Sequence, residues 1–382
     1  MIKGFINNKI MFLTPGLKRA GQEKVVYELA IGFRSKGYEV EVTSFYGGPY
    51  KEALESLDIK VNLLAKTSSG TNVSKIQLLK NFINLVKTKS DFNFIFHGIG
   101  FEKLWMFCVL TNSKKPFSVF VFHNNYPFIN KQKLNFKKFQ LKIFLRFINK
   151  VVFIKKSMML KVVDNGVLQA NQNIKVIENG IEIPEVIESS IELDDLKSKL
   201  GFQKDDKILL QVGRFVDQKN QITSIKALEL LKDEIPNLKL VLLGEGKNMA
   251  YCKDYVSEAR LNDRIIFKGN VSNVKEYLNI ADLFLMPSDF EGHPIALIEA
   301  MMLNVKSVVY KAPGIQDFLP KDLDCLNYVI PTTPLKMAEI IASIVLSKSP
   351  QLDIKLFTEV CEWVRQNYSQ DKMVNEYINL LA

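Results

Sequence analysis

The chain has 382 residues, of which 47% are hydrophobic and 24% charged, values typical of a globular protein with two domains. This composition excludes a disordered or fibrous chain, and no apolar run approaches the roughly 20 residues that span a membrane. The four cysteines form no CxxC pair and the first residues contain no recognisable export signal, so a reducing, cytoplasmic location is expected.

The formal net charge of +10 is unevenly distributed along the chain. Residues 1–180 carry +17 and residues 181–382 carry −7. A basic half suits nucleic acid, an anionic membrane surface or an anionic substrate, and a basic surface that only aids solubility is the alternative. Because no RRM, KH or helix-turn-helix signature is present, nucleic acid is not expected as a partner.

Short β-branched and aromatic segments alternate with longer amphipathic segments, a pattern that predicts βαβ units and parallel sheets. In the first half, the expected strands are residues 9–16, 38–46, 91–98, 117–125, 150–156 and 174–180. In the second half, they are residues 207–213, 238–244, 264–269, 282–288 and 306–310. The predicted fold class is α/β, with two Rossmann-like, doubly wound domains.

An acidic segment, residues 181–206, lies between the two sets of strands and is expected to form the linker and one leading helix. We predict an N-terminal domain of residues 1–182, to which residues 362–382 return as a C-terminal helix, and a second domain of residues 183–361. Ligands of open α/β sheets bind at the carboxyl ends of the strands, so the function is expected in a central cleft between the domains.

Two cations follow the expected strand 207–213. Gly213 permits close approach of backbone and ligand, Arg214 comes next, and Lys219 lies five residues further on. A rigid guanidinium fork and a compact ammonium group together suit a diphosphate and stabilise charge on a leaving phosphate. Either cation alone is also typical of an ordinary surface salt bridge.

The segment 288–302, SDFEGHPIALIEAMM, changes to strong helix formers at Pro294, where a helix is expected to begin. The start of such a helix favours an anion. Glu291 precedes the helix and Glu299 lies inside it, so the two carboxylates are expected to reach different parts of one ligand, one of them the hydroxyls of a ribose. The alternative is that Glu291 only complements the helix dipole and Glu299 lies on a solvated face.

The N-terminal half gives weaker signals. Residues 14–30 form a loop with glycines, including Gly21, that runs into a helix near Gln22. His123 and His97 each end an expected strand, where an imidazole either reaches a ligand or only makes a local hydrogen bond. The chain has three histidines and no HxH, HExxH or His/Cys cluster, so no protein-held metal is expected.

The segment 131–150 contains seven basic residues, no acidic residue and many Phe, Leu and Ile residues. This composition suits an interfacial helix that lies on anionic lipid. Apolar residues at positions 141, 144, 145 and 148 fit equally well a helix that packs on the core and has a basic outer face. Both interpretations remain open at this point.

Three other motifs are set aside. The segments 98–103 and 244–249 begin like a dinucleotide fingerprint but lack its last glycine, and there is no P-loop. Neither NAD nor P-loop ATP chemistry is therefore expected. The D-x-D sequence at residues 322–324 lies too late in the chain to follow a nucleotide-binding strand, and we treat it as chance.

Taken together, these residues resemble the family-four retaining glycosyltransferases of GT-B fold, most strongly from Ile208 to Asp317. The resemblance implies that Arg214 and Lys219 hold the donor diphosphate, that Glu291 contacts the sugar and that Glu299 binds the ribose. The implied catalytic residues are Glu291, Arg214, Lys219 and His123. The implied donor-binding residues are Gly21, Gly213, Arg214, Lys219, Gly292, His293, Pro294, Ile295, Ala296 and Glu299. The dipeptide Asn179-Gly180 also matches the family pattern.

The sequence departs from that family pattern at four places. Asn220 stands where a glycine usually follows the lysine, and Ala20 stands in place of the first glycine of the N-terminal pair. A Gly-x-Pro expected after the helix is Asn304-Val305-Lys306, and Asp317 stands where a glutamate is more usual. These changes concern loop geometry more than the charged residues.

The resemblance implies a hexosyltransferase that needs no metal or other cofactor and moves a sugar from a nucleotide donor, most often UDP-linked, with retention of configuration. The expected acceptor is a glycan, in particular a lipid-linked glycan held by the basic N-terminal domain at the inner face of a bacterial membrane. The expected pathway is capsule, exopolysaccharide or lipopolysaccharide assembly. The alternatives are a nucleotide-sugar epimerase, which needs no acceptor, and a catalytically inactive subunit of a polysaccharide assembly complex.

Overall fold

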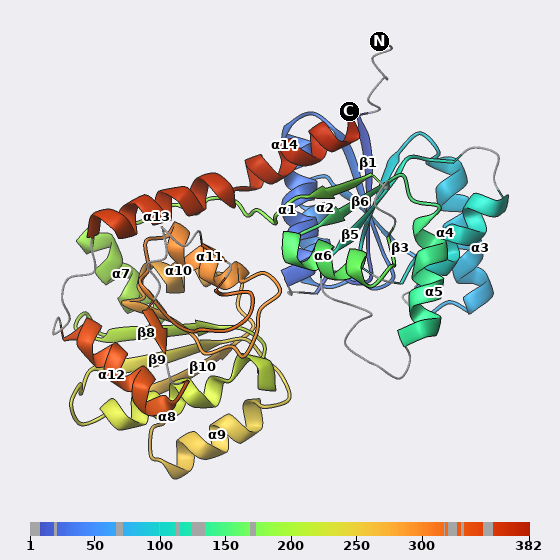
Figure 1. The fold of residues 1–382 in the computed structure, drawn as a ribbon. Coiled ribbons are helices and arrows are strands. Elements are labelled where there is room, and N and C mark those ends of the chain that lie inside the picture. The colour runs from blue at the N-terminus through green and yellow to red at the C-terminus, as the bar shows by residue number, and fades with distance from the viewer. Residues whose placement is uncertain are drawn as a thin grey trace. The chain divides into compact units, whose positions relative to one another are not determined.

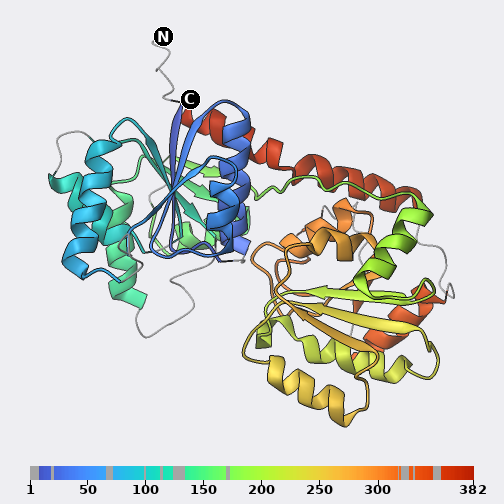
Figure 2. The same cartoon turned by 180° about the vertical axis from the view of Figure 1, so that it is seen from behind.

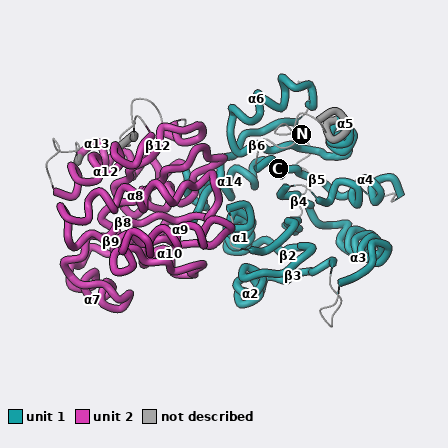
Figure 3. The backbone as a smooth tube through the Cα atoms, turned by 90° about the horizontal axis from the view of Figure 1, so that it is seen from below, with its two compact units in different colours: residues 1–182, 368–382 teal, residues 183–367 magenta. Residues whose placement is uncertain are grey.

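The computed structural model describes residues 8–18, 21–65, 72–98, 100–111, 115–123, 134–168, 173–316, 318–319, 327–329, 332–346 and 354–382. The chain divides into two compact units (Figure 3). Unit 1 comprises Met1–Glu182 and Tyr368–Ala382, and unit 2 comprises Ile183–Asn367. Each unit is built on its own parallel sheet with helices packed around it (Figures 1 and 2), so the predicted α/β fold class is confirmed.

The sheet of unit 1 has seven strands in the order β3-β2-β1-β4-β5-β6-β7. The strands are β1 (Lys9–Thr14), β2 (Glu39–Ser44), β3 (Lys60–Leu63), β4 (Asn93–His97), β5 (Ser118–Phe122), β6 (Lys150–Phe153) and β7 (Ile174–Val176). The helices are α1 (Gly21–Ser35), α2 (Pro49–Glu55), α3 (Lys75–Thr88), α4 (Glu102–Thr111), α5 (Leu134–Leu145), α6 (Lys156–Asp164) and α14 (Gln370–Leu381). The chain order reverses beside β1, which is where α/β sheets bind ligands.

The sheet of unit 2 has six strands in the order β10-β9-β8-β11-β12-β13. The strands are β8 (Lys207–Val212), β9 (Leu238–Leu243), β10 (Ile265–Gly269), β11 (Leu283–Met286), β12 (Ser307–Tyr310) and β13 (Asn327–Val329). The helices are α7 (Ser190–Leu200), α8 (Gln221–Leu231), α9 (Met249–Glu258), α10 (Val274–Asn279), α11 (Ile295–Met302), α12 (Pro334–Val345) and α13 (Ile354–Asn367). Here the chain order reverses between β8 and β11. These two strands precede the segment that contains Lys219 and the segment that contains Glu291.

All eleven expected strands are present, and the structure adds β3 and β13. Each additional strand lies at an edge of its sheet, and the two are only four and three residues long. The residues of β3 are partly or fully exposed, so this strand lacks the buried apolar run that marks a central strand such as β1, whose Ile10 to Leu13 are fully buried.

The C-terminal segment forms two helices where one was expected. The break lies at Tyr368 and Ser369, and the Ser369 hydroxyl accepts a hydrogen bond from the Lys372 amide at 3.3 Å, which caps α14. Helix α13 packs on α11 in unit 2, and α14 packs on α1 in unit 1. A β-carbon at Gly180 would lie 2.1 Å from the Ser369 carbonyl oxygen, which explains the glycine of the Asn179-Gly180 pair.

The segment 131–150 is described from residue 134 onward, where it forms α5. Leu141, Phe144 and Leu145 are buried, whereas the Phe139 side chain is 60% exposed. The core-facing spacing predicted at positions 141, 144, 145 and 148 is therefore present at the first three, whereas Ile148 lies beyond the end of α5 and is partly exposed. Within the described part of the chain, no helix has the length and hydropathy that crossing a membrane requires.

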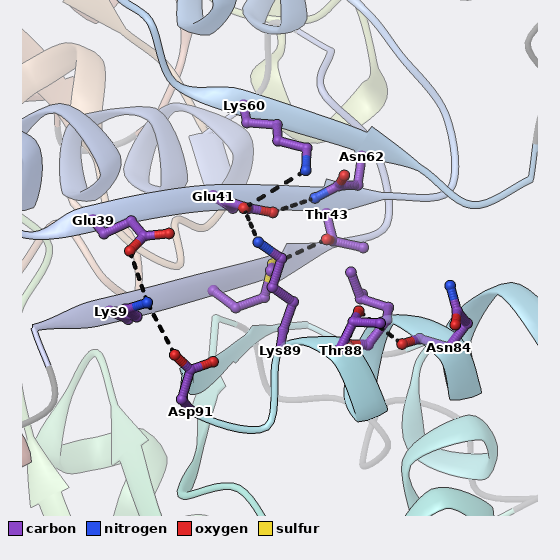
Figure 4. Close-up of polar contacts among 12 residues, drawn as sticks. Lys9, Glu39, Glu41, Thr43, Lys60, Asn62, Asn84, Thr88, Lys89 and Asp91 are labelled. Atoms are coloured by element: carbon purple, nitrogen blue, oxygen red, sulfur yellow. Dashed lines mark hydrogen bonds and ion pairs between the residues drawn. The ribbon is translucent and has the colours of Figure 1, made fainter.

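A buried carboxylate lies in the sheet of unit 1, on β2 (Figure 4). Glu41 is 5% exposed, accepts a hydrogen bond from the Asn62 amide at 2.9 Å, and forms ion pairs with Lys89 and Lys60. Lys89 follows the last turn of α3, so the contact ties that helix to the sheet. Glu39, on the same strand, instead forms an exposed ion pair with Lys9 (Figure 4).

Replacing Glu41 with Ala should lower the free energy of unfolding of unit 1 by about 3 kcal/mol, because it leaves the Lys89 ammonium beside apolar surface without its counter-ion. Glu39→Ala is the matched control and should cause only a small fraction of that loss. The measurement is urea denaturation followed by the fluorescence of Trp105 in a Trp363→Phe background, so that the signal reports unit 1 alone. Equal losses in both variants would contradict this account of Glu41.

Candidate functional site

The loop after β8 holds Lys219 over a glycine. The amide of Gly213 donates to the Leu243 carbonyl at 2.9 Å, and a β-carbon at Gly213 would lie 3.4 Å from the Lys219 Cδ. Lys219 ends a short 3-10 turn, Asp217–Lys219, and its carbonyl accepts a hydrogen bond from the Gln211 side chain at 2.8 Å. The stem of Lys219 therefore lies along the backbone at the carboxyl end of β8.

The lysine forms an ion pair with one of the two predicted glutamates. Lys219 Nζ lies 2.6 Å from Glu291 Oε1, and the side chains are 20% and 6% exposed. The pair joins the loop after β8 to the loop after β11, 72 positions apart in sequence. A mostly buried ammonium and carboxylate hold each other here, and a bound anion at Lys219 would compete with Glu291 for the same charge.

Two further hydrogen bonds fix the same pair of loops. The Asp289 amide donates to the Gln218 carbonyl at 3.0 Å, and the Gln218 side chain donates to the Phe290 carbonyl at 2.7 Å. The Glu291 amide donates to the Pro313 carbonyl at 2.9 Å in the loop after β12. The backbone around Glu291 is thus held from two neighbouring loops.

Three glycines that the sequence analysis did not assign to the site allow these loops to approach one another. A β-carbon at Gly244 would lie 2.2 Å from the Gly213 carbonyl oxygen, and a β-carbon at Gly246 would lie 2.4 Å from the Phe215 carbonyl oxygen. At Gly314 it would lie 1.8 Å from the carbonyl oxygen of Glu291. Gly244 and Gly246 belong to the segment 244–249, so their spacing reflects loop packing rather than a dinucleotide fingerprint.

Helix α11 begins at Ile295, with Pro294 as its N-cap, one residue later than expected. Gly292 is exposed, and His293, Ile295 and Ala296 are partly exposed near this helix start. Glu299 is only 8% exposed, so the alternative of a solvated helix face for this residue is wrong.

Arg214 differs from Lys219 in its surroundings. Arg214 is exposed, and its guanidinium forms no ion pair with any residue in the described part of the chain. Its carbonyl accepts a hydrogen bond from the Gln221 side chain at 3.0 Å, which positions the backbone but leaves the side chain in solvent. The structure thus brings Gly213, Lys219 and Glu291 together, and places Arg214 on the same loop.

Two of the departures from the family pattern have a conformational explanation. Asn220 has φ 50° and Asn304 has φ 59°, both in the left-handed region where glycine is favoured and asparagine is tolerated. The Asn304 side chain also accepts a hydrogen bond from Arg365 at 2.7 Å. Asparagine therefore keeps the loop geometry that glycine would give. The other two departures, at residues 20 and 317, lie outside the described residues.

The N-terminal candidates lie in unit 1. Gly21 is the first residue of α1, and His123 follows the end of β5. His123 Nε2 lies 2.8 Å from Nδ1 of His97, the last residue of β4. Burial lowers the pKa of His123 to about 3, and burial together with the charge of His123 lowers the pKa of His97 well below its usual range. Both imidazoles are therefore neutral at neutral pH.

Two family models match the chain. Residues 193–355 match "Glycosyl transferases group 1", and residues 19–184 match "Glycosyltransferase Family 4". Together these matches cover most of both units. The chain therefore belongs to the family 4 glycosyltransferases of GT-B fold.

Relatives with a curated description match over shorter stretches. N-acetyl-alpha-D-glucosaminyl L-malate synthase of Bacillus anthracis is 26% identical over 55% of this chain and 54% of its own length. UDP-Gal:alpha-D-GlcNAc-diphosphoundecaprenol alpha-1,3-galactosyltransferase of Escherichia coli is 29% identical over 40% of each chain. The chain thus spans about half, or less, of the length of these two relatives.

The fold similarity extends over the whole chain. The crystal structure of HepE from Anabaena in complex with UDP and glucose has a TM-score of 0.77 and covers 97% of this chain and 98% of its own. The sequence identity is 19%, so this likeness concerns the fold alone. It confirms the predicted GT-B architecture.

Asn220 provides a test of the left-handed position beside Lys219. Asn220→Ala should destabilise unit 2 by about 1 kcal/mol more than Asn220→Gly, because a β-carbon is disfavoured at φ 50°. Both variants lose the contact between Asn220 Oδ1 and the Thr223 hydroxyl at 3.0 Å, so the difference isolates the backbone. Differential scanning calorimetry measures it, and equal transitions would contradict the conformational role.

The two buried histidines should make unit 1 sensitive to acid. Their pKa values are lower in the folded protein than in the unfolded chain, so the unfolded chain binds more protons below about pH 6.5 and stability falls as the pH decreases. From pH 7 to 5.5 each histidine should remove about 1 kcal/mol. A His97→Asn/His123→Asn double variant should lose less over this range, measured by the Trp105 fluorescence described above. A parallel decline in both proteins would contradict the lowered pKa values.

Proposed function

We propose that the chain transfers a sugar from a nucleotide sugar to an acceptor, without a metal ion and with retention of configuration. The observation that carries this proposal is the Lys219–Glu291 ion pair at the carboxyl edge of the sheet in unit 2. In this pair a cation of the kind that binds diphosphates lies beside a carboxylate of the kind that binds sugar hydroxyls, on loops fixed by backbone hydrogen bonds.

The two cations of the β8 loop would bind the donor diphosphate. Lys219 is positioned over Gly213 and its charge is balanced by Glu291, while Arg214 is exposed and able to close on a ligand. As the bond to the leaving phosphate breaks, negative charge grows on the diphosphate, and these cations stabilise it. This is the role that a divalent metal has in other enzymes, which supports a metal-independent reaction.

The carboxylates would bind the rest of the donor. When Lys219 turns toward a phosphate, the Glu291 carboxylate becomes available to accept hydrogen bonds from sugar hydroxyls. Glu299, in α11, would accept from the ribose hydroxyls, and the residues at the start of that helix, from Gly292 to Ala296, would surround the phosphate end. For His123 and Gly21, which lie in unit 1, we propose a role in contacting the transferred sugar.

The bond changes in this reaction balance without an enzymic nucleophile. The bond between the anomeric carbon and the phosphate oxygen breaks, and the acceptor oxygen bonds to the anomeric carbon on the same face. The acceptor proton passes to the departing phosphate oxygen. Because the acceptor oxygen is the nucleophile in this step, we assign the Glu291 carboxylate to binding of sugar hydroxyls rather than to attack on the sugar.

A UDP-linked donor and a lipid-linked glycan acceptor are the substrates we propose. The E. coli relative is named for UDP-Gal and a diphosphoundecaprenol acceptor, and HepE was crystallised with UDP and glucose. The B. anthracis relative is named for L-malate, so the two relatives differ in acceptor. The charge of +17 over residues 1–180 favours the anionic lipid diphosphate, and hence a role in cell-surface polysaccharide assembly.

The surface of unit 1 supports a peripheral location at the inner face of the membrane. Lys103, Phe107 and Leu110 recur on one exposed face of α4, and the two apolar side chains are 44% and 70% exposed. The neighbouring α5 exposes Phe139, and Arg146 is exposed just after it. Exposed apolar and basic side chains on adjacent helices suit contact with anionic lipid.

The donor site is tested with a thermal-shift titration of the full chain against UDP, GDP, ADP and their sugar conjugates, in buffer with a chelator. One nucleoside diphosphate should raise the melting temperature, because a ligand of the folded state stabilises it. Lys219→Ala and Glu299→Ala should each weaken donor binding at least about tenfold, the effect expected when a charge-assisted contact is removed.

Lys207→Ala is the matched control, because Lys207 lies at the opposite end of β8, where it forms a partly exposed ion pair with Asp282 at 3.2 Å. It should bind the nucleotide like the wild type. Wild-type affinity in Lys219→Ala and Glu299→Ala would refute the site, and absence of any nucleotide shift in a folded sample would favour a catalytically inactive subunit. Conversion of the donor sugar without an acceptor would favour an epimerase.

A further inference from the structure

The imidazoles of His97 and His123 form a contact that neither the family models nor the sequence analysis explains. Their ring nitrogens, Nδ1 of His97 and Nε2 of His123, are 2.8 Å apart. His97 ends β4 and is fully buried, and His123 follows β5, which pairs with β4 in parallel. The carboxyl ends of these two strands therefore bring the rings together, with centroids 5.0 Å apart.

The backbone and ring of His97 are held from several sides. The Gln22 side chain, in the first turn of α1, donates a hydrogen bond to the His97 carbonyl at 2.9 Å. The ring of His97 packs against Phe12 of β1 with centroids 5.8 Å apart. The next residue, Gly98, has φ 78°, and a β-carbon there would lie 2.7 Å from Gln22 Nε2. His97 is thus fixed before any ligand binds.

A hydrogen bond between two neutral imidazoles requires an N–H on one nitrogen and a lone pair on the other. Burial keeps both rings neutral, so only two arrangements are possible. In the first, His97 Nδ1–H donates to His123 Nε2. In the second, His123 Nε2–H donates to His97 Nδ1. The proton of His97 then lies on Nε2.

The surroundings of His97 Nε2 decide between the two arrangements. This atom is buried and has no hydrogen-bond partner among the described residues. A buried N–H without a partner is rarer and more costly than a buried lone pair without one. The proton of His97 is therefore at Nδ1, and the Nε2 atom of His123 accepts it.

We propose that His97 is a positioning residue that holds His123 in the Nδ1–H tautomer, so that His123 presents a hydrogen-bond donor and not a base to its ligand. The proposal rests on the proposed function for the identity of that ligand, a sugar or phosphate oxygen that accepts the Nδ1–H bond. Since Nε2 is already engaged by His97, His123 is excluded as a general base through that nitrogen.

The test is nitrogen NMR of the full chain labelled with 15N-histidine, in which two-bond 15N–1H correlations distinguish the tautomers. The chain has three histidines, and a His293→Gln variant leaves only the two of interest. Between pH 6 and 8 both should be neutral and protonated at Nδ1, the opposite of the Nε2–H tautomer that a free imidazole favours. An Nε2–H signal for His123 would overturn the proposal.

Two substitutions at His97 separate hydrogen bonding from packing. His97→Asn keeps an N–H donor near the position of Nδ1 and should keep His123 in the Nδ1–H tautomer, whereas His97→Leu should release it to Nε2–H. If His97→Leu does not fold, the wild-type and His97→Asn spectra still decide the tautomer. An unchanged His123 tautomer in folded His97→Leu would contradict the positioning role.

Turnover gives a second readout. In sugar transfer, kcat should fall about tenfold in His97→Leu and recover to within about threefold in His97→Asn, with little change in the KM for the donor. Equal kcat values in wild type and folded His97→Leu would contradict the role of the tautomer in catalysis. A wild-type protein that shows the tautomer but transfers no sugar would refute the proposed function and leave the histidine arrangement standing.

Discussion

The candidate donor site depends on one ion pair, between Lys219 and Glu291, that joins two loops at the carboxyl edge of a parallel sheet. Each partner is mostly buried, so removal of either would leave a charge in poorly solvated surroundings. The ion pair keeps both side chains ordered where the strand order reverses between β8 and β11. A diphosphate that takes the place of the carboxylate at Lys219 would enter a site whose geometry is already set.

The close approach of backbones around this ion pair explains why small or left-handed residues surround it. Gly244 packs against the Gly213 carbonyl and Gly314 against that of Glu291, while Asn220 turns the chain directly after Lys219. Loops this close leave no space for a side chain between them, so they hold the two charged groups within hydrogen-bonding distance. The histidine pair of unit 1 is likewise held by its neighbours. His97 contacts Gln22 and Phe12 as well as His123.

The amino-acid sequence was sufficient to predict the central strands, because a strand such as β1 is a run of fully buried apolar residues. It did not predict β3 or β13, which are short, nor the break at Ser369, since capping by one serine is a weak signal within a long helical pattern. Arg214, Lys219, Glu291 and Glu299 were selected as candidates from spacing and residue type. The ion pair between Lys219 and Glu291 was not predicted, because it joins loops 72 positions apart and depends on tertiary packing. His97 was noticed only as a strand end, because the burial of its Nε2 atom cannot be read from sequence.

A crystal structure of the full chain with the nucleoside diphosphate that stabilises it would test the central claim most directly. The account predicts that the diphosphate lies within hydrogen-bonding distance of Lys219 Nζ and that the Lys219–Glu291 ion pair is broken or shared with the ligand, with Glu299 beside the ribose. A diphosphate bound away from the loops after β8 and β11, with the ion pair unchanged, would contradict it.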